Sequence, residues 1–595
     1  MAYETYQRTD NDERTYLAYL MNLFSEVRNR RANFEPLWEE AASLCWPEYR
    51  NSFSFGSVRA PGMKYTEFQL DTSASIASHR FMAVCDALMT PFSMPWARMR
   101  ASDSDLMKDR NVKLYYERVT EIMWQERYKA EANFMGSQQV NWQSVGVFGG
   151  QNMLTDELDI SVGGGQERGL RYIPCPPGEI YLLRNHQGRV DGFIRHFRWN
   201  ARQAYQKWPE IVKEKFKSAL DRNSQELFDF LQFVMPRTDY KPEAILTPQS
   251  KPYSSCYISC APACILEEGG YRTFPLAHGG YMLAPGEEYE RGPAQQVLPA
   301  LKTLNAEKAL FLKAGQYAAD PMKLLPGDDS LFDFKAHPGS YVYGGITEDG
   351  KPLVANLAGG DIQITLEMMQ EERRCVDDAF LVSLYAFLFG DAKNSRARNA
   401  REVIEYLNDR ALFLAPTLGK QFGYLAGVVS REYDVLSYQR KFPPKPPALR
   451  EAQGQYTDVA QWTSPLALAL RGPAAAGFLR TVEIAAATVQ AGGPPDVMDI
   501  FDFEVALPEI AEDQFTPTRW MSTPQKIAAT RQGRAKQQQQ ENYIKSLPGL
   551  AAKAKADAIS QKAQAGMNIG GVLSGTPEGG MPMMPGQSEP GGRPF

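Results

Sequence analysis

The chain has 595 residues, a formal net charge of −5 and a hydrophobic fraction of 43%. A chain this long exceeds one ordinary core, so roughly three to five structural units are expected, and the composition excludes a disordered or fibrous protein. The negative net charge excludes nucleic-acid binding through an overall basic surface, so any such contact has to be local or weak.

The first part of the chain is predicted to be helical. Apolar positions recur at helical spacing in residues 12–45, a second helix is expected within residues 71–96, and a third covers about residues 104–146. The N-terminus lacks the continuous apolar stretch of a secretion signal. The longest strongly apolar run, at residues 381–389, is half of the ~18 residues that cross a bilayer, so we expect no membrane contact.

A β-meander is predicted next. Residues 149–199 contain short β-branched and aromatic segments separated by Gly, Pro and Asn turn signals. A helical piece is expected at about residues 201–235, and strands return in the segment "YSSCYISCAPACILEEGGYRTFPL". The first half of the chain is therefore predicted to be a mixed α/β unit.

The seven cysteines and five histidines predict neither a disulfide framework nor a metal centre. The cysteines are odd in number and form no CxxC pair, and the histidines form no HExxH motif. Cys256, Cys260 and Cys264 have an even spacing that would place them on one face of a strand. We interpret them as buried small residues, and we expect no metal and no cofactor.

Two long amphipathic helices are predicted after the charged Gly/Pro turn at residues 285–293. The apolar stripe of the first helix contains Val297, Leu301, Leu304 and Phe311. The second helix is expected at residues 366–389, and its apolar face contains Leu366, Met369, Val376, Phe380, Leu384 and Phe387. About 45 residues rich in Gly, Pro and aromatic side chains separate the two helices, which predicts a small β module between them.

This β module contains a lookalike of a nucleotide-binding loop. Gly345 is followed after four residues by Gly350 and Lys351, as in GxxxxGK[ST], but Pro352 replaces the Ser or Thr that holds Mg²⁺. Asp349 and Gly350 are better explained as a turn between two strands.

A basic segment follows the second long helix. Within residues 390–401 the basic side chains are Lys393, Arg396, Arg398 and Arg401, against Asp391 alone. A further amphipathic helix is expected after this segment, with kinks at Pro416 and Gly419. By itself such a loop would be a solvated surface feature. Here two long helices are expected to hold its ends, so its basic side chains would have a defined place in the fold.

Six segments occur in an order that resembles the portal, or head-to-tail connector, proteins of short-tailed, T7-like bacteriophages. They are "DTSASIASHRFMAVCDALMTPFSMPW" (71–96), "NFMGSQQVNWQSVGVFGGQNML" (133–154), "PPGEIYLLRNHQGRVDGFIRHFRW" (176–199), "PGEEYERGPAQQVLPALKTLN" (285–305), "NAREVIEYL" (399–407) and "SPLALA" (464–469). The resemblance covers most of residues 10–540. Glu290 is a departure, because the family more often has Gly there, and we expect it to affect the turn into the first long helix.

The resemblance implies an α+β, mainly helical portal fold that assembles as a ring of about twelve subunits around a central channel. The implied parts are a wing (1–291), a first stem helix (292–318), a clip (319–364), a second stem helix (365–389), a tunnel loop (390–398), a kinked wing helix (399–440) and a crown (441–545). Residues 546–595 would be a flexible tail or would extend a barrel of long helices.

The resemblance also implies roles for individual residues. Lys393, Arg396, Arg398 and Arg401 would face the phosphates of double-stranded DNA without reading its sequence. The stem residues expected at the interface between subunits are Leu301, Leu304, Val376, Phe380, Leu384 and Phe387, because an apolar stripe on each stem helix would be too wide for its own subunit to cover.

The implied protein is a non-enzymatic virion component at the head-tail junction of one capsid vertex, made in the host cytoplasm. Its implied partners are the major capsid and scaffolding proteins, the large terminase subunit, a tail adaptor and internal core proteins at the crown. Two alternatives stay open: a nucleotide-dependent packaging motor component, which needs an intact phosphate loop, and a membrane-associated DNA-ejection pore, which needs longer apolar segments.

Overall fold

The structure is a computed structural model, and it describes residues 13–540 together with Lys555. The gaps are residues 56–61, 63, 68, 159–167, 223, 244–246, 320–322, 327–336, 338, 348, 352–361, 383–417, 453, 455, 491–499, 514–515, 517 and 524. The chain divides into two compact units, Met1–Thr518 and Arg519–Phe595. Each unit is described separately below.

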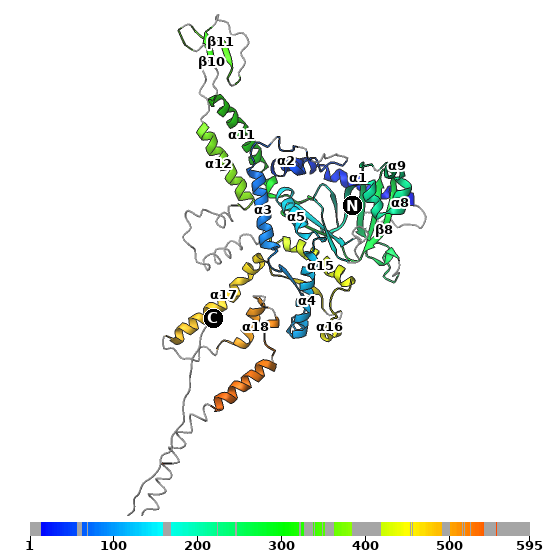
Figure 1. Ribbon diagram of the computed structural model, residues 1–595, viewed down its shortest axis with the longest axis vertical. Helices are drawn as coiled ribbons and strands as arrows, with labels where there is room; N and C mark the ends of the chain where they lie inside the picture. The colour runs from blue at the N-terminus through cyan, green and yellow to red at the C-terminus, as the bar shows by residue number, and fades with distance from the viewer. Residues whose placement is uncertain are drawn as a thin grey trace, which may run out of the picture. The chain divides into compact units, whose positions relative to one another are not determined.

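Helices predominate in the first unit, and they are mixed with antiparallel strands (Figure 1). Its α-helices are α1 (Glu13–Arg31), α2 (Glu35–Cys45), α3 (Ser73–Met89), α4 (Arg110–Arg127), α5 (Phe134–Phe148), α7 (Ala201–Lys207), α8 (Pro209–Lys215), α9 (Lys217–Asp221), α10 (Pro293–Gln296), α11 (Leu298–Ala319), α12 (Ile362–Ala379), α15 (Gln421–Tyr438), α16 (Pro447–Glu451), α17 (Pro465–Gln490) and α18 (Phe503–Asp513). Short 3-10 turns lie at Pro47–Tyr49, Leu106–Lys108, Pro248–Ser250 and Thr518–Trp520.

The strands of the described residues form four sheets. They are β1 (Ala97–Ala101), β2 (Gly150–Glu157), β3 (Leu170–Pro174), β4 (Ile180–Arg184), β5 (Val190–Asn200), β6 (Leu227–Pro236), β7 (Tyr253–Cys260), β8 (Ala263–Tyr271), β9 (Leu276–Gly280), β10 (Lys323–Pro326), β11 (Tyr341–Ile346) and β12 (Asp458–Trp462). The strand orders are β4-β5-β6-β7-β8, β3-β2-β9, β1-β12 and β10-β11. All pairs are antiparallel except β10 with β11.

The strands predicted at residues 149–199 are present, but they do not form one meander, because β2 and β3 pair in the three-stranded sheet and β4 and β5 in the five-stranded sheet. Two predicted helical segments also differ from the structure. The helix expected at residues 104–146 is broken between α4 and α5, where Asn133 adopts a left-handed backbone with φ 57°. The helical piece expected to reach residue 235 ends with α9, and β6 follows as the middle strand of the five-stranded sheet. A short apolar run fits a buried strand as well as a helix, so pairing with β5 and β7 decided the outcome.

The three closely spaced cysteines do not share one strand. Cys256 and Cys260 lie on β7, whereas Cys264 lies on β8, after the turn of the hairpin. Cys256 is buried and the other two are partly exposed. Across the described ranges, no group of three or more His, Cys, Asp or Glu side chains is placed to hold a metal ion.

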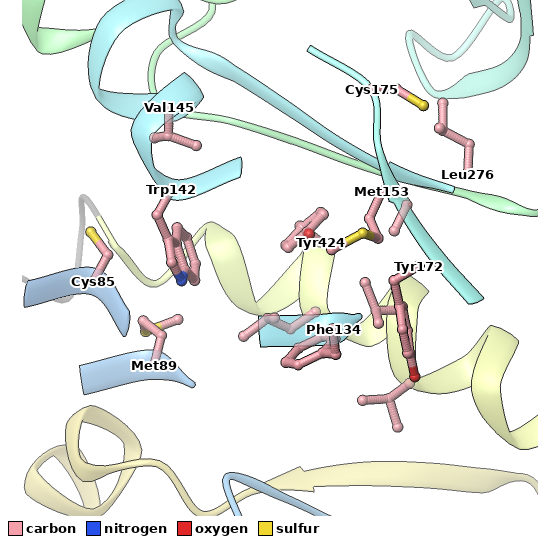
Figure 2. Close-up of a cluster of buried hydrophobic side chains, with 14 of the residues drawn as sticks. Cys85, Met89, Phe134, Trp142, Val145, Met153, Tyr172, Cys175, Leu276 and Tyr424 are labelled. Atoms are coloured by element: carbon pink, nitrogen blue, oxygen red, sulfur yellow. The ribbon is translucent and has the colours of Figure 1, made fainter. Parts of the chain in front are cut away.

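The largest core lies where α5, α15 and the sheet β3-β2-β9 meet. Trp142 and Phe134 of α5, Met153 of β2, Tyr172 of β3 and Tyr424 of α15 are all buried there (Figure 2). Most of α5 is buried, because helices and strands cover it on several sides. The buried pair of Arg127 and Glu432, 2.5 Å apart, joins α4 to α15 beside this core.

The start of the region expected to be a crown belongs to the main body. β12 pairs with β1, in a register that joins Trp462 to Ala97. Leu449 of α16 and Leu466 of α17 are part of the largest core. The expected interruption of the helix near Gly419 is seen as a turn at residues 419–420 directly before α15, whereas residues 399–417 lie outside the described residues.

In the second unit the described chain forms a helix at residues 525–540. Thr523 caps it, because its side-chain oxygen accepts a hydrogen bond from the backbone N–H of Lys526 at 3.2 Å. The expected tail at 546–595 lies outside the described residues, apart from Lys555.

Candidate functional site

The helix pair α11–α12 is the candidate functional element. The two helices lie side by side, with β10 and β11 at their far end (Figure 1). The Glu307 and Glu372 carboxylates interact across the pair. The stem helices were expected at 292–318 and 365–389, and in the structure they are Leu298–Ala319, preceded by the short α10, and Ile362–Ala379. The second helix therefore ends earlier than expected, because Leu381 adopts a left-handed backbone with φ 59°.

The root of the pair is buried in its own chain. Leu301 and Leu304 of α11, Val376 of α12 and Phe380 directly after α12 are each at most 3% exposed. Phe380 packs edge-on against Phe81 of α3 with 6.2 Å between ring centroids. At these four positions the apolar stripes are therefore covered by their own subunit, contrary to the expectation that they are too wide for it. Their side chains offer almost no surface to a neighbouring subunit.

The outer part of the pair is different. Leu310 of α11 is 65% exposed, and Leu312, Leu366 and Met368 are also exposed. Leu384 and Phe387, the other two residues expected at a subunit interface, lie outside the described residues. Among the described residues of the pair, the apolar surface that a neighbour could cover is thus found away from the root.

Polar contacts fix the root to the body. The Asn305 side-chain oxygen accepts a hydrogen bond from the backbone N–H of Leu70 at 2.8 Å, and Arg373 donates to Asp71 at 2.6 Å. Burial alone would raise the pKa of Asp71, but hydrogen bonds from Arg373 and Ser73 lower it. One loop before α3 therefore holds both α11 and α12.

The turn that leads into α11 is fixed by a buried carboxylate. Glu290 is 6% exposed; its Oε1 accepts from Arg184 of β4 at 2.7 Å and lies 3.0 Å from Nε2 of His278 on β9. Burial alone would raise the pKa of Glu290, but the charges and hydrogen bonds of His278 and Arg184 lower it to about 2. Glu290 thus ties two sheets to the turn at residues 281–292.

His278 meets a polar group at each ring nitrogen. Nε2 lies 3.0 Å from Oε1 of Glu290, and Nδ1 lies 2.8 Å from the side-chain oxygen of Asn152. The amide nitrogen of Asn152 donates to the backbone oxygen of Cys175 at 3.1 Å. Glu290 therefore lies between Arg184 and His278, and Asn152 fixes the orientation of the His278 ring.

This cluster could not be found from the sequence. Arg184 precedes Glu290 by 106 residues, and His278 lies on a strand of a different sheet. The sequence signals near this cluster were the Gly/Pro turn at residues 285–293 and the expectation that Glu290 affects it. A side chain on Gly280 would overlap Glu290, so the carboxylate fills the space that this glycine leaves.

Close backbone contact completes the junction. Gly149, with φ 87° at the end of α5, packs against the backbone of Arg291 and Gly292. A Cβ on Gly292 would lie 2.6 Å from the backbone oxygen of Val145. Both glycines are needed because the turn into α11 crosses α5 without room for a side chain.

One carboxyl between the two helices lacks a hydrogen-bond partner among the described residues. Glu307 of α11 is buried, and its Oε2 makes no hydrogen bond within the described part of the chain. Burial and the nearby Glu372 of α12 raise the pKa of Glu307. Two acidic groups thus face each other where α11 and α12 meet.

The lookalike nucleotide loop is a turn. The backbone N–H of Gly350 donates to the oxygen of Thr347 at 2.9 Å, and Gly350 has φ 76°. The turn follows β11 directly, whereas the second strand expected after it lies outside the described residues. The four basic residues expected to face DNA, Lys393, Arg396, Arg398 and Arg401, also lie outside the described residues.

Comparison with known protein families shows which family the chain belongs to. The family described as "Bacteriophage head to tail connecting protein" matches residues 18–521, which include nearly all of the helices and sheets of the first unit described above. The chain belongs to this family of head-to-tail connecting proteins. The α11–α12 pair and its junction lie within the matched range.

Related proteins extend this comparison. The head-to-tail connecting protein is 24% identical over 543 residues to the "Probable portal protein" of Bordetella phage BPP-1, an alignment that covers 89% of this chain and 92% of that protein. Two solved structures of gene transfer agent particles also match. A chain of the "Virion of native gene transfer agent (GTA) particle" is 11% identical with a TM-score of 0.33, and one from the "Neck of empty GTA particle computed with C6 symmetry" is 13% identical with a TM-score of 0.31; each match covers 71% of this chain and 91% of the other.

Proposed function

We propose that this head-to-tail connecting protein is the portal subunit of a short-tailed phage, and that its ring forms the channel through which DNA is packaged and ejected. The observation that carries the proposal is the family match over residues 18–521. The relative from Bordetella phage BPP-1, aligned over 92% of its own length, is named a probable portal protein, which supports the same function for this chain.

Within this ring of about twelve subunits, α11 and α12 are the stem, and the module that contains β10 and β11 is the clip. The body formed by residues 1–291 and 399–440 is the wing, and the helices from α17 onward are the crown. The buried junction around Glu290 supports this division, because it holds the turn into α11 rigidly against two sheets of the body.

The stem packs against neighbouring stems through its outer apolar residues. Leu310 and Met368, at least half exposed, are suited to this contact, whereas Leu301 and Phe380 are already covered. A closed ring requires heterologous contacts, in which different faces of one subunit meet. Leu384 and Phe387 remain proposed members of this interface.

The loop at residues 390–398 is the tunnel loop. Lys393, Arg396 and Arg398, with Arg401 beyond them, repeat around the ring and contact DNA phosphates without sequence specificity. An acidic protein with a narrow basic ring would hold DNA weakly enough to let it slide.

The ring occupies the portal vertex of the virion at the head-tail junction. Its partners are the major capsid and scaffolding proteins during assembly, the large terminase subunit during packaging, and the tail adaptor afterwards. The clip binds the terminase and the adaptor, and the crown faces internal core proteins.

The protein itself hydrolyses no nucleotide in this proposal. The observations against a motor component are the tight turn closed by the hydrogen bond from Gly350 to Thr347, and Pro352 in place of the Ser or Thr that holds Mg²⁺ in a phosphate-binding loop. None of the described helices combines the length and hydropathy that a bilayer-spanning segment needs. Neither alternative has an observation in its favour.

The mass of the purified particle tests the proposal. A closed ring of about twelve subunits of 66.7 kDa is expected by native mass spectrometry. A monomer at all concentrations, with or without scaffolding protein, would reject the portal assignment.

The tunnel loop has its own test. Replacing Lys393, Arg396 and Arg398 with Gln should leave ring mass and procapsid assembly unchanged, while packaging becomes slower or less complete, or packaged DNA leaks. The salt dependence of DNA retention should also weaken, since salt then screens fewer phosphate contacts. Unchanged packaged length, retention and salt response would remove the loop from the channel.

A further inference from the structure

The helix at residues 525–540 in the second unit is fully exposed. Every residue in this range has an exposed side chain, including Ile527, its only large apolar residue. Thr523 caps the first turn, and the side chain of Thr530 donates to the backbone oxygen of Lys526 at 2.8 Å. The helix thus has a capped first turn, yet no face of it is buried by the described residues of its own unit.

Its charge has one sign. Lys526, Arg531, Arg534 and Lys536 are its ionisable residues, and the range contains no Asp or Glu. Because the whole chain has a net charge of −5, the rest of the chain is more acidic still. The helix is a local positive surface on an acidic protein.

We propose that the helix at residues 525–540 is a second DNA-binding surface, which contacts the phosphate backbone of double-stranded DNA without reading its sequence. The proposal rests on the portal function proposed above. It concerns residues distinct from the tunnel loop and is tested separately.

The geometry of the helix fits a phosphate backbone. Sixteen residues span roughly 24 Å, comparable to about seven base pairs at ~3.4 Å each, and Lys526, Arg534 and Arg531 lie within an arc of about 140°. Lys536 lies on the adjoining side. The glutamines at 537–540 add amide donors, which form neutral hydrogen bonds to phosphate oxygens beside the charged contacts.

A second copy of the helix is a poorer partner. Packing between identical helices requires an apolar stripe, and Ile527 is the only large apolar residue in this range. Identical helices would also bring four positive charges each to the contact, without an acidic residue of the helix to pair with them. A polyanion such as DNA neutralises these positive charges, whereas a second copy of the helix would repel them.

The test compares two charge-matched variants of the full chain. The first replaces Lys526, Arg531, Arg534 and Lys536 with Gln, which keeps helix propensity. The control replaces four exposed cations of the first unit with Gln: Arg202, Lys213, Lys217 and Arg222. Both variants lose the same net charge, so a difference between them reports the helix itself.

The probe is a random-sequence DNA duplex titrated at several salt concentrations. In the helix variant, the slope of log affinity against log salt should fall by ~0.9 for each phosphate that the protein no longer neutralises, and affinity at low salt should fall about tenfold or more. The control should keep the wild-type slope. Equal decreases in both variants, or no decrease in the helix variant, would overturn the proposal.

Two further measurements separate the remaining outcomes. Polyglutamate is a second probe: at equal charge concentration it should bind the helix more weakly than the more densely charged duplex, and tighter helix-dependent binding of polyglutamate than of DNA would show that the DNA assignment is wrong and an acidic protein is the partner. Native mass is measured for every variant. A wild-type protein that forms no ring rejects the portal function, whereas an unchanged ring with normal DNA affinity in the helix variant rejects only the present inference.

Discussion

The root and the outer part of the α11–α12 pair belong to the same two helices but have opposite surroundings. At the root, Phe380 is 1% exposed and packs on Phe81, and Arg373 bonds to Asp71. Further out, Leu310 is 65% exposed. Both parts carry apolar residues at helical spacing, so the pattern alone does not tell which part its own chain covers.

The difference teaches that an amphipathic stripe can serve two purposes along one helix. The root uses it to complete the fold of the subunit, and the outer part leaves it available for another surface. Changes at the root should therefore alter the free energy of unfolding, while changes further out should leave it nearly unchanged.

Phe380→Ala should lower the free energy of unfolding by about 4 kcal/mol, because it leaves a cavity among α3, α5 and α12. The urea midpoint at unchanged m value measures this. Leu310→Ala is the matched control on the exposed part and should cost less than about 0.5 kcal/mol. Similar costs for the two changes would refute the division between root and outer part.

Glu290→Gln should cost about 3 kcal/mol at neutral pH, because Arg184 and His278 lose their buried carboxylate. The folded-state pKa of Glu290 lies near 2, below its usual 4.5. Its stabilisation is therefore present above pH 4.5 and is lost as pH falls toward 2. Urea midpoints between these pH values should fall less steeply in the variant than in the wild type.

Glu288→Gln is the control for this change. Glu288 lies two residues away, and its ion pair with Arg30 is exposed, so it should have little effect on either stability or its pH dependence. If both variants reduce the fall of the urea midpoint between pH 4.5 and 2 equally, the buried cluster around Glu290 is not the cause of that fall.

Arg373→Ala should cost about 1 kcal/mol, since the Arg373 side chain is partly exposed while Asp71 is mostly buried. Arg374→Ala, at the neighbouring position, should have no measurable effect on the urea midpoint. In the Arg373 variant, amide exchange should become faster near the start of α3, because Asp71 also bonds to Ser73. Unchanged exchange there would show that the ion pair does not hold the loop.

Leu310→Asp should change the free energy of unfolding of the single chain by less than about 0.5 kcal/mol, the smallest effect of the series. Under the proposed portal function it should nevertheless weaken assembly, because a charge would enter the contact between stems. Native mass spectrometry measures ring assembly, whereas the urea midpoint measures the stability of the single chain. Rings that form normally would place the subunit contact elsewhere on the stem.

Several elements were predictable because their signals are local. The turn at residues 285–293 followed by a long helix, the strand segments β2 to β5 and the turn at Gly350 depend on neighbouring residues, and the structure confirms them. That β2 and β3 lie in a different sheet from β4 and β5 was not predicted. The resemblance to head-to-tail connectors also rested on short segments in order, and the family match confirms it.

Other features were not predictable because they depend on partners far away in the chain. The apolar run of β6 became a strand only because β5 and β7 flank it, and β12 joined the body only through β1. The cluster of Arg184, His278 and Glu290 needs three separate segments to meet.

Sequence patterns alone indicated that two long helices follow the turn at residues 285–293, which of their faces are apolar, and which family the chain resembles, because periodicity, turn residues and motif order are properties of nearby positions. Only the tertiary structure decided that Leu301, Leu304, Val376 and Phe380 are covered by their own chain, and that Glu290 is held ionised between Arg184 and His278. Burial and charge pairing depend on which distant segments pack together, and a local pattern does not contain that information.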